Sequence, residues 1–429
     1  MRIAVVGSGI AGLASAWLLA RRHEVVLFEA QARLGGHTHT HTLDIDGERC
    51  HVDSGFIVYN NHNYPLLAAL FAELGVATQP TSMSFSVQNE ASGLEYNAAT
   101  LDTLFCQRRN LFSPRFWGML RDLRRFYRLA PALLDSPAPG PTLAEYLAAQ
   151  GFGQAFRDDH LIPMASALWS SPAAGILQFP ARYLVRFMAQ HRMLQITGRP
   201  EWRVVRGGSH CYVAALASRW RLEVRSATPV QALRRDADGV EVEAGGRRER
   251  FDHAVVACHS DEALALLADA DTREHEILGA IPYQSNDTIL HTDTRLLPRQ
   301  RKAWAAWNAY VPAQADAVCT VSYWMNRLQN LTTTTPLIVT LNRSAAIDPA
   351  KVLRRLHYRH PVYTEAAVAA QTRQGEIQGK RRTWFAGAYW GWGFHEDGLR
   401  SAVAVARALG VEWPGAASTT DPDLLRPAA

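Results

Sequence analysis

The sequence RIAVVGSGIAG at residues 2–12 joins an apolar run, typical of a buried strand, to a glycine-rich turn of the form G-x-G-x-x-G. Apolar side chains at helical spacing follow over residues 13–19, and a second apolar run over residues 24–28 ends in Glu29. This order predicts a strand, a helix and a second strand, with the pyrophosphate of a dinucleotide at the helix N-terminus. A glycine-rich turn that binds nothing is disfavoured, because strand, helix, second strand and acid are all in register.

Each glycine of this turn has its own expected role. Gly7 permits the tight turn, Gly9 lets the pyrophosphate approach the backbone, and Gly12 lets the helix pack closely on the strand. Glu29 is placed to accept hydrogen bonds from the adenosine ribose, and its carboxylate would repel a 2′-phosphate.

The residues after Glu29 distinguish a flavin from a nicotinamide nucleotide. Arg33 stands four residues after the acid, and the pair Gly35-Gly36 follows. This pattern resembles the E-x-x-x-R-x-G-G extension of flavoproteins with two dinucleotide-binding domains, which include flavin amine oxidases, protoporphyrinogen oxidase and phytoene desaturases. The resemblance implies FAD, with Arg33 facing a phosphate and the glycine pair beside the pyrophosphate and ribityl chain.

The last cofactor segment is expected at residues 383–402. An apolar strand ends in Gly387, an aromatic and glycine-rich loop follows, and a helix is expected to begin near Gly398. This resembles the closing motif of the same superfamily, in which a helix N-terminus faces the flavin and stabilises the negative charge of the reduced ring. The acid that usually follows the glycine is absent here. No cysteine follows Cys319, so the FAD is expected to be non-covalent.

The resemblance carries over to individual residues. The expected cofactor-binding residues are Gly7, Gly9, Ile10, Ala11, Gly12, Glu29, Ala30, Arg33, Gly35, Gly36, His37, Thr38, Val230, Gly387, Trp390, Gly398 and Leu399. Val230 would meet the adenine edge through its backbone. Tyr389, Trp392 and His395 are the candidate catalytic residues that line the site. His395 is the candidate acid or base, and a purely structural histidine is the alternative.

The fold class implied is α/β, a Rossmann-like FAD-binding domain with an inserted α+β substrate domain. The FAD-binding domain is expected in three parts, at residues 1–60, 200–265 and 376–429. A mainly helical part of the substrate domain is expected at residues 61–199, and its sheet at residues 266–375.

Composition narrows the function classes. The chain has 429 residues, of which 20% are charged and 48% hydrophobic, and its net charge is +5. Because the basic residues are scattered along the sequence, nucleic-acid binding receives little support. Five cysteines without a C-x-x-C pair indicate reduced thiols. Met1 leads directly into the first strand, and no run approaches the roughly 18 apolar residues that span a bilayer. We therefore expect a cytoplasmic protein, at most peripheral at the inner membrane.

Alternating histidines and threonines occupy residues 37–42. In a strand, His37, His39 and His41 would share one face, as in a metal site. No carboxylate or cysteine stands at ligand spacing, so no metal is expected and the histidines are interpreted as polar lining beside the cofactor.

A basic amphipathic helix is predicted at Pro114–Leu134, with Trp117 and five arginines outside its apolar side. Such a helix could contact an anionic membrane surface. A solvated helix that covers the core is the preferred interpretation.

A closer resemblance to one subfamily implies a more specific function. The sequence resembles a bacterial subfamily of predicted NAD/FAD-binding oxidoreductases associated with cyclopropane-fatty-acyl synthases. The stretches that carry this resemblance are residues 389–398, His37-Thr38 and residues 323–329. That implies desaturation, oxidation or double-bond isomerisation of a hydrophobic acyl or membrane-lipid substrate. A flavin amine oxidase and a non-catalytic flavin-binding partner of a lipid-modifying enzyme are the alternatives. Substrate identity, electron acceptor and oligomeric state stay open.

Overall fold

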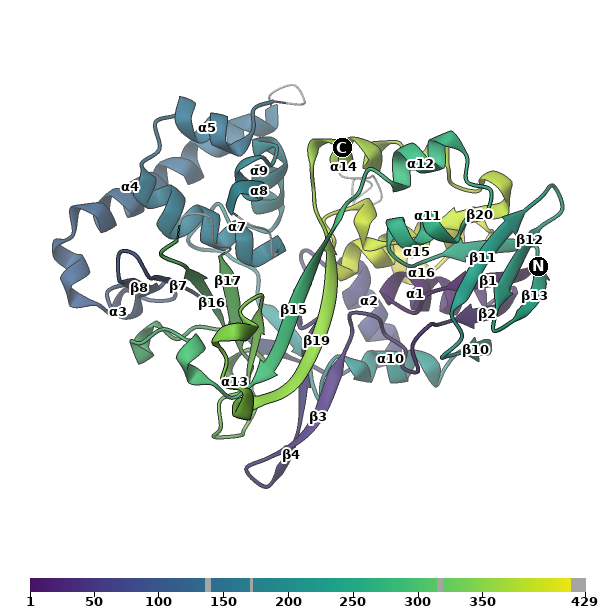
Figure 1. Cartoon of the computed structure of the whole chain (residues 1–429), viewed down its shortest axis with the longest axis horizontal. Coiled ribbons are helices and arrows are strands. Elements are labelled where there is room, and N and C mark those ends of the chain that lie inside the picture. The colour runs from purple at the N-terminus through teal and green to yellow at the C-terminus, as the bar shows by residue number, and fades with distance from the viewer. Residues whose placement is uncertain (136–139, 170–172, 315–318, 418–429) are drawn as a thin grey trace.

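The computed structural model describes residues 1–135, 140–169, 173–314 and 319–417, and its elements form two lobes (Figure 1). One lobe contains a parallel sheet between two layers, and the other contains a mixed sheet and a group of helices. The expected α/β class with a Rossmann-like cofactor domain and a substrate domain is confirmed. Within the described ranges, no helix is both long enough and apolar enough to cross a membrane.

The parallel sheet has the strand order β10-β2-β1-β14-β20. Its strands, paired in parallel throughout, are β1 (Arg2–Val6), β2 (Glu24–Phe28), β10 (Glu223–Arg225), β14 (His253–Val256) and β20 (Thr383–Phe385). Alternate side chains enter different cores: Ile3 and Val5 face one side, whereas Ala4 faces the other. Both faces are therefore buried, as parallel sheets require.

Helices cover one face, and helices with a small antiparallel sheet cover the other. The first layer consists of α1 (Ile10–Leu19), α2 (Pro65–Leu74), α10 (His210–Ala217), α15 (His395–Ala408) and α16 (Pro414–Ala417). The second consists of α11 (Ser260–Leu266), α12 (Thr272–Leu278), α14 (Glu365–Thr372) and the strands β11 (Val230–Arg235), β12 (Val240–Ala244) and β13 (Arg247–Phe251).

The mixed sheet has the order β19-β15-β18-β17-β16-β7-β8. Its strands are β7 (Phe85–Asn89), β8 (Leu94–Asn97), β15 (Tyr283–His291), β16 (Trp307–Val311), β17 (Thr320–Trp324), β18 (Ile338–Leu341) and β19 (Val352–Pro361). Five of these strands, β15 to β19, lie within residues 266–375.

Helices of the second lobe pack beside this sheet (Figure 1). They are α3 (Leu101–Leu104), α4 (Pro114–Leu129), α5 (Leu143–Ala149), α6 (Gln154–Phe156), α7 (Ile162–Trp169), α8 (Ala173–Leu177) and α9 (Ala181–Gln190), with the short α13 (Met325–Leu328) between β17 and β18. The helix expected to reach Leu134 ends at Leu129, and a 3₁₀ helix continues over Ala130–Asp135.

Two smaller sheets connect the lobes. The hairpin β3 (Thr40–Ile45) and β4 (Glu48–Asp53) turns at Asp46 and Gly47, whose φ values are 55° and 78°. Positive φ at both positions is the geometry of a two-residue hairpin turn, and Asp-Gly is a sequence that favours it. The other sheet has the order β5-β9-β6, from β5 (Val58–Tyr59), β6 (Thr78–Thr81) and β9 (Trp202–Val205).

Candidate flavin and substrate site

The turn between β1 and α1 is built so that only glycine fits at two positions. A Cβ atom on Gly12 would lie 1.8 Å from the carbonyl oxygen of Gly7, and one on Gly7 would lie 2.9 Å from that of Ala257. At Gly9 a Cβ atom would meet nothing within 4 Å. Gly9 is also the N-cap of α1 without a side-chain cap, so the first N–H groups of the helix can receive an anion.

Glu29 lies at the end of β2 beside this turn. Its carboxylate accepts hydrogen bonds from the backbone N–H of Ser8 (2.9 Å) and of Gln31 (2.7 Å). The carbonyl oxygen of Glu29 accepts a hydrogen bond from the N–H of Thr228 (2.9 Å), two residues before Val230 at the start of β11. The two residues expected to bind the adenosine half are thus held on adjoining segments.

The segment after Glu29 passes directly over the glycine turn. A Cβ atom on Gly36 would lie 2.9 Å from the Cα atom of Gly9, and the N–H of Gly35 donates to the carbonyl of Ser8 (3.0 Å). Arg33 donates to the carbonyl oxygens of Gly36 (2.8 Å) and of residue 38 (3.2 Å). The guanidinium therefore closes this loop, and its contact with a phosphate stays a prediction.

The N-terminus of α15 lies against the glycine turn. We call the glycine turn (residues 7–12), the segment over residues 29–38 and this helix N-terminus the cradle. A Cβ atom on Gly398 would lie 2.8 Å from Cγ2 of Ile10, so the first turns of α15 and α1 are in contact. The helix begins at His395, three residues before the expected start. The reason is Asp397, whose Oδ2 accepts hydrogen bonds from the backbone N–H groups of Trp392 and Phe394, each at 3.0 Å.

His395 joins two cofactor segments. Its Nε2 lies 3.0 Å from Oγ1 of Thr38 and 3.3 Å from the hydroxyl of Tyr212, and its ring stacks on Phe56 with centroids 3.7 Å apart. Burial, with a smaller contribution from His37, lowers the pKa of His395 to about 3. The imidazole is neutral and bonded to protein groups here, and both the acid–base role and the structural role of His395 stay predictions.

The closing loop sends its aromatic side chains in two directions. Tyr389 and Trp390 pack in the core between the parallel sheet and its second layer, and the Tyr389 ring fills the space that a Cβ atom on Gly387 would need. Trp392 instead belongs to the core of the helical lobe. The structure thus separates Tyr389 from Trp392, which the sequence places together in one substrate site.

Helix α9 supplies an aromatic wall against this loop. The ring of Trp392 lies 4.3 Å from that of Tyr183 and 5.7 Å from that of Phe187, and its Nε1 donates to Oε1 of Gln190 (3.1 Å). Phe394 stacks on Phe187 at 5.5 Å. Sequence reasoning did not place α9 against the closing loop, although its aromatic residues at i and i+4 are the signal that could have found it.

The alternating histidines do not share one face. Only His41 lies within β3; its ring is 4.1 Å from that of His39, whereas the ring of His37 approaches Tyr358 (5.0 Å) and His360 (5.4 Å). The three would share one face only in a strand over residues 37–41, and here β3 begins at Thr40 while His37 lies in the preceding turn. Among the described residues, no group of three or more His, Cys, Asp or Glu side chains could hold a metal ion.

Two buried carboxylates that sequence reasoning did not assign to the site hold its segments together. Asp53 accepts hydrogen bonds from the N–H of Ser209 (2.9 Å) and Nε2 of Gln329 (2.7 Å), and burial raises its pKa to about 6. Glu396 on α15 accepts from the N–H of Leu66 at the start of α2 (2.9 Å), and burial raises its pKa to about 7. Both fix helix N-termini around the cradle, since they satisfy N–H groups that the helices leave unpaired.

Comparisons with known proteins agree with this geometry. The sequence matches the flavin containing amine oxidoreductases over residues 10–410. Three similar solved structures each cover 95% of this chain. Cyclohexylamine oxidase from Brevibacterium oxydans has a TM-score of 0.67 and 18% identity, with 99% of its own chain covered. A fatty acid isomerase from P. acnes that produces CLA and putrescine oxidase bound to putrescine each have a TM-score of 0.66 and 15% identity, with 98% and 99% of their own chains covered. No curated protein matches the chain. The chain belongs to the flavin-containing amine oxidoreductase family and is an FAD-dependent oxidoreductase.

Proposed function

We propose that this oxidoreductase desaturates, oxidises or isomerises a hydrophobic substrate, a fatty-acyl chain or a modified membrane lipid. The observation that carries the proposal is the aromatic wall at the closing loop. Trp392, Tyr183, Phe187 and Phe394 form a continuous set of ring contacts between α9 and the N-terminus of α15. Tyr183, Phe187 and Trp392 are packed in the core of the helical lobe, and an environment of large rings with few polar groups is the kind that suits an apolar chain.

The residues of the cradle fit FAD held without a covalent bond. The open backbone at Gly9 would take the pyrophosphate, Glu29 and Val230 the adenosine half, and the N-terminus of α15 near Gly398 the flavin. When bound, the flavin supplies hydride transfer at N5. No cysteine follows Cys319 in the sequence, which supports a non-covalent cofactor.

The protein's own contribution is orientation and exclusion of water. The α9 wall would hold an apolar substrate against the closing loop, and the neutral His395 would hold Thr38 in place. Tyr183 and Tyr363 are uncharged at this wall, because burial keeps their pKa values well above the usual range.

A primary amine is the second candidate substrate. The same aromatic rings would also accept a neutral amine, and cyclohexylamine oxidase and putrescine oxidase share the fold. The fatty acid isomerase shares it as well, so the fold alone does not choose between amine and acyl chain.

Anaerobic absorbance of the bound flavin at about 450 nm distinguishes an acyl substrate from an amine substrate. The holoenzyme is titrated with unsaturated fatty acids and phospholipids, and separately with primary amines. Bleaching by lipids, or a shifted double bond in the recovered lipid without net bleaching, supports the proposal. Bleaching by amines alone would contradict it in favour of an amine oxidase.

Replacement of His395 tests whether its imidazole transfers protons. We expect His395→Gln to lower kcat/KM without altering the shape of its pH profile over about pH 5 to 9, because a group with a pKa of about 3 does not titrate there. The measurement is kcat/KM against pH for both proteins, with Thr38→Val as the matched control that removes the same hydrogen bond. An apparent pKa that disappears only in His395→Gln would instead establish it as an acid or base.

A further inference from the structure

Four large apolar side chains are exposed together at one end of the helical lobe. Leu101 is 76% exposed, Leu111 42%, Phe112 87% and Trp117 50%. Trp117 donates its Nε1–H to the carbonyl oxygen of Leu111 (2.9 Å), which places the two side by side. We call these four residues the apolar tip. They lie on α3, the 3₁₀ helix Arg108–Phe112 and the first turn of α4, at the end of the molecule remote from β13 (Figure 1).

A basic stripe continues from the tip along α4. Trp117, Arg121, Arg124 and Arg128 follow the spacing i, i+4, i+7 and i+11, so they share one helix face, and all four are exposed. The opposite face buries Phe116, Met119 and Phe126. We call Arg121, Arg124 and Arg128 the basic stripe.

The charge around the tip is strongly positive. Residues 99–128 contain seven arginines and two aspartates, a formal charge of +5 that equals the net charge of the whole chain. Both aspartates are already paired: Asp102 binds Lys302 (2.9 Å) and Arg108, and the buried Asp122 binds Arg125 (2.9 Å) and, at 3.4 Å, Arg121, which is itself 71% exposed. The remaining positive charge therefore faces solvent beside the apolar tip.

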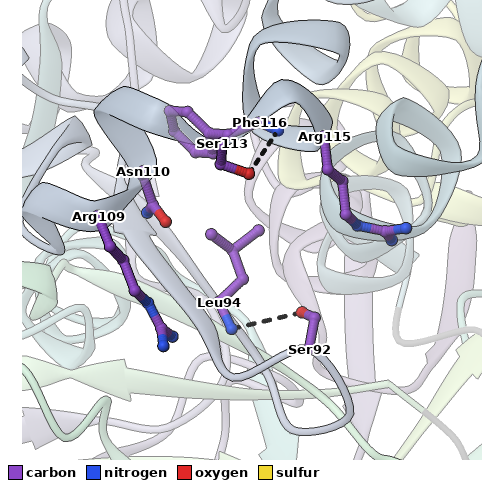
Figure 2. A pocket seen from close by; sticks show the side chains of 7 residues that line it. All are labelled: Ser92, Leu94, Arg109, Asn110, Ser113, Arg115 and Phe116. Atoms are coloured by element: carbon purple, nitrogen blue, oxygen red, sulfur yellow. Dashed lines mark hydrogen bonds between the residues drawn. The ribbon is translucent and has the colours of Figure 1, made fainter.

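A small cavity next to the tip does not form a single anion site. Its volume is about 180 Å³, and its lining residues are Ser92, Leu94, Arg109, Asn110, Ser113, Arg115 and Phe116 (Figure 2). Figure 2 shows the guanidinium groups of Arg109 and Arg115 pointing away from one another, and Arg115 is held by the buried Asp159 (2.9 Å). The surface thus offers distributed charge with protruding apolar groups.

We propose that the apolar tip and the basic stripe dock this enzyme on a bilayer that contains anionic phospholipids. The tip enters the boundary between headgroups and acyl chains, and the stripe lies along the phosphates, as in peripheral amphipathic helices. An exposed apolar patch with a basic border is the complement of that surface. Docking does not depend on the acyl chemistry proposed above, because it concerns a surface outside the flavin and substrate site.

Co-sedimentation of the holoenzyme with vesicles tests the proposal. We expect binding to vesicles of phosphatidylcholine with phosphatidylglycerol, much weaker binding to phosphatidylcholine alone, and weaker binding at high salt. The tip variant Leu111→Ser/Phe112→Ser and the stripe variant Arg121→Gln/Arg124→Gln/Arg128→Gln should each lose at least about tenfold in affinity. Because these side chains are exposed, bound flavin and thermal stability should be unchanged.

Two matched controls separate docking from general charge or hydrophobicity. Arg247→Gln/Arg248→Gln/Arg250→Gln removes the same charge from β13 at the other end of the molecule, and Ile196→Ser removes an apolar side chain that is 70% exposed elsewhere. Both should bind anionic vesicles like the wild type. Absence of wild-type binding, or equal loss in the controls, would overturn the proposal. If light scattering shows that the wild type is a dimer and the tip variant a monomer, and the wild type does not bind vesicles, the proposal is overturned in favour of self-association.

Discussion

Gly9→Val is expected to remove the flavin and leave the fold intact. The backbone at Gly9 is extended, with φ −64° and ψ 178°, which any residue adopts, and a Cβ atom there meets no protein atom within 4 Å. The branched side chain would instead occupy the space expected for the pyrophosphate at the N-terminus of α1. We expect flavin affinity to fall by at least about 100-fold, or about 2.7 kcal/mol, as measured by fluorescence titration of the flavin-free protein.

The control for this variant is Gly375→Ala. Gly375 likewise has open space around a Cβ atom, but it lies outside the cradle. Both variants should unfold at the wild-type temperature when flavin is absent, and only Gly9→Val should lose the cofactor. A Gly9→Val protein that retains wild-type flavin would show that the dinucleotide lies elsewhere.

The cofactor half of the site could be predicted because its signals are local. The glycine turn, the strand ending in Glu29 and the pair Gly35-Gly36 lie within residues 2–36, where spacing alone fixes the backbone. The turn at Asp46-Gly47 was equally predictable, since both residues tolerate positive φ.

The substrate half could not be predicted, because its contacts join distant segments. Tyr183 meets Trp392 across 209 residues of sequence, and spacing along the chain carries no information about that contact. Asp53 likewise binds Gln329, which is 276 residues away in the sequence. The start of α15 was misplaced for a local reason: Asp397 caps its own helix from within the first turn. The division of the chain into domain segments, the cytoplasmic location and the roles of the individual flavin-binding residues stay predictions.

Trp392→Ala is expected to cost both stability and substrate turnover. Trp392 is 7% exposed, and its removal would leave a cavity beside Tyr183 and Phe187, at a cost of about 3–5 kcal/mol in the free energy of unfolding. If these rings hold the substrate, the rate of flavin reduction by an acyl substrate should also fall, by about 100-fold. Chemical denaturation and anaerobic stopped-flow absorbance measure the two effects.

A second buried tryptophan separates the two contributions. Trp413 is 2% exposed in the core beneath α1 and, like Trp392, donates its Nε1–H to a side-chain oxygen, here Glu73 Oε2 at 2.6 Å. Trp413→Ala should therefore lose similar stability while flavin reduction stays close to the wild-type rate. Trp392→Phe guards against a variant that fails to fold. It keeps a ring in the wall, loses the bond to Gln190 and part of the ring volume, and should reduce flavin at an intermediate rate. If Trp392→Phe and Trp413→Ala both reduce flavin as fast as the wild type, and a folded Trp392→Ala does so too, the aromatic wall is ordinary core and the substrate binds against another surface.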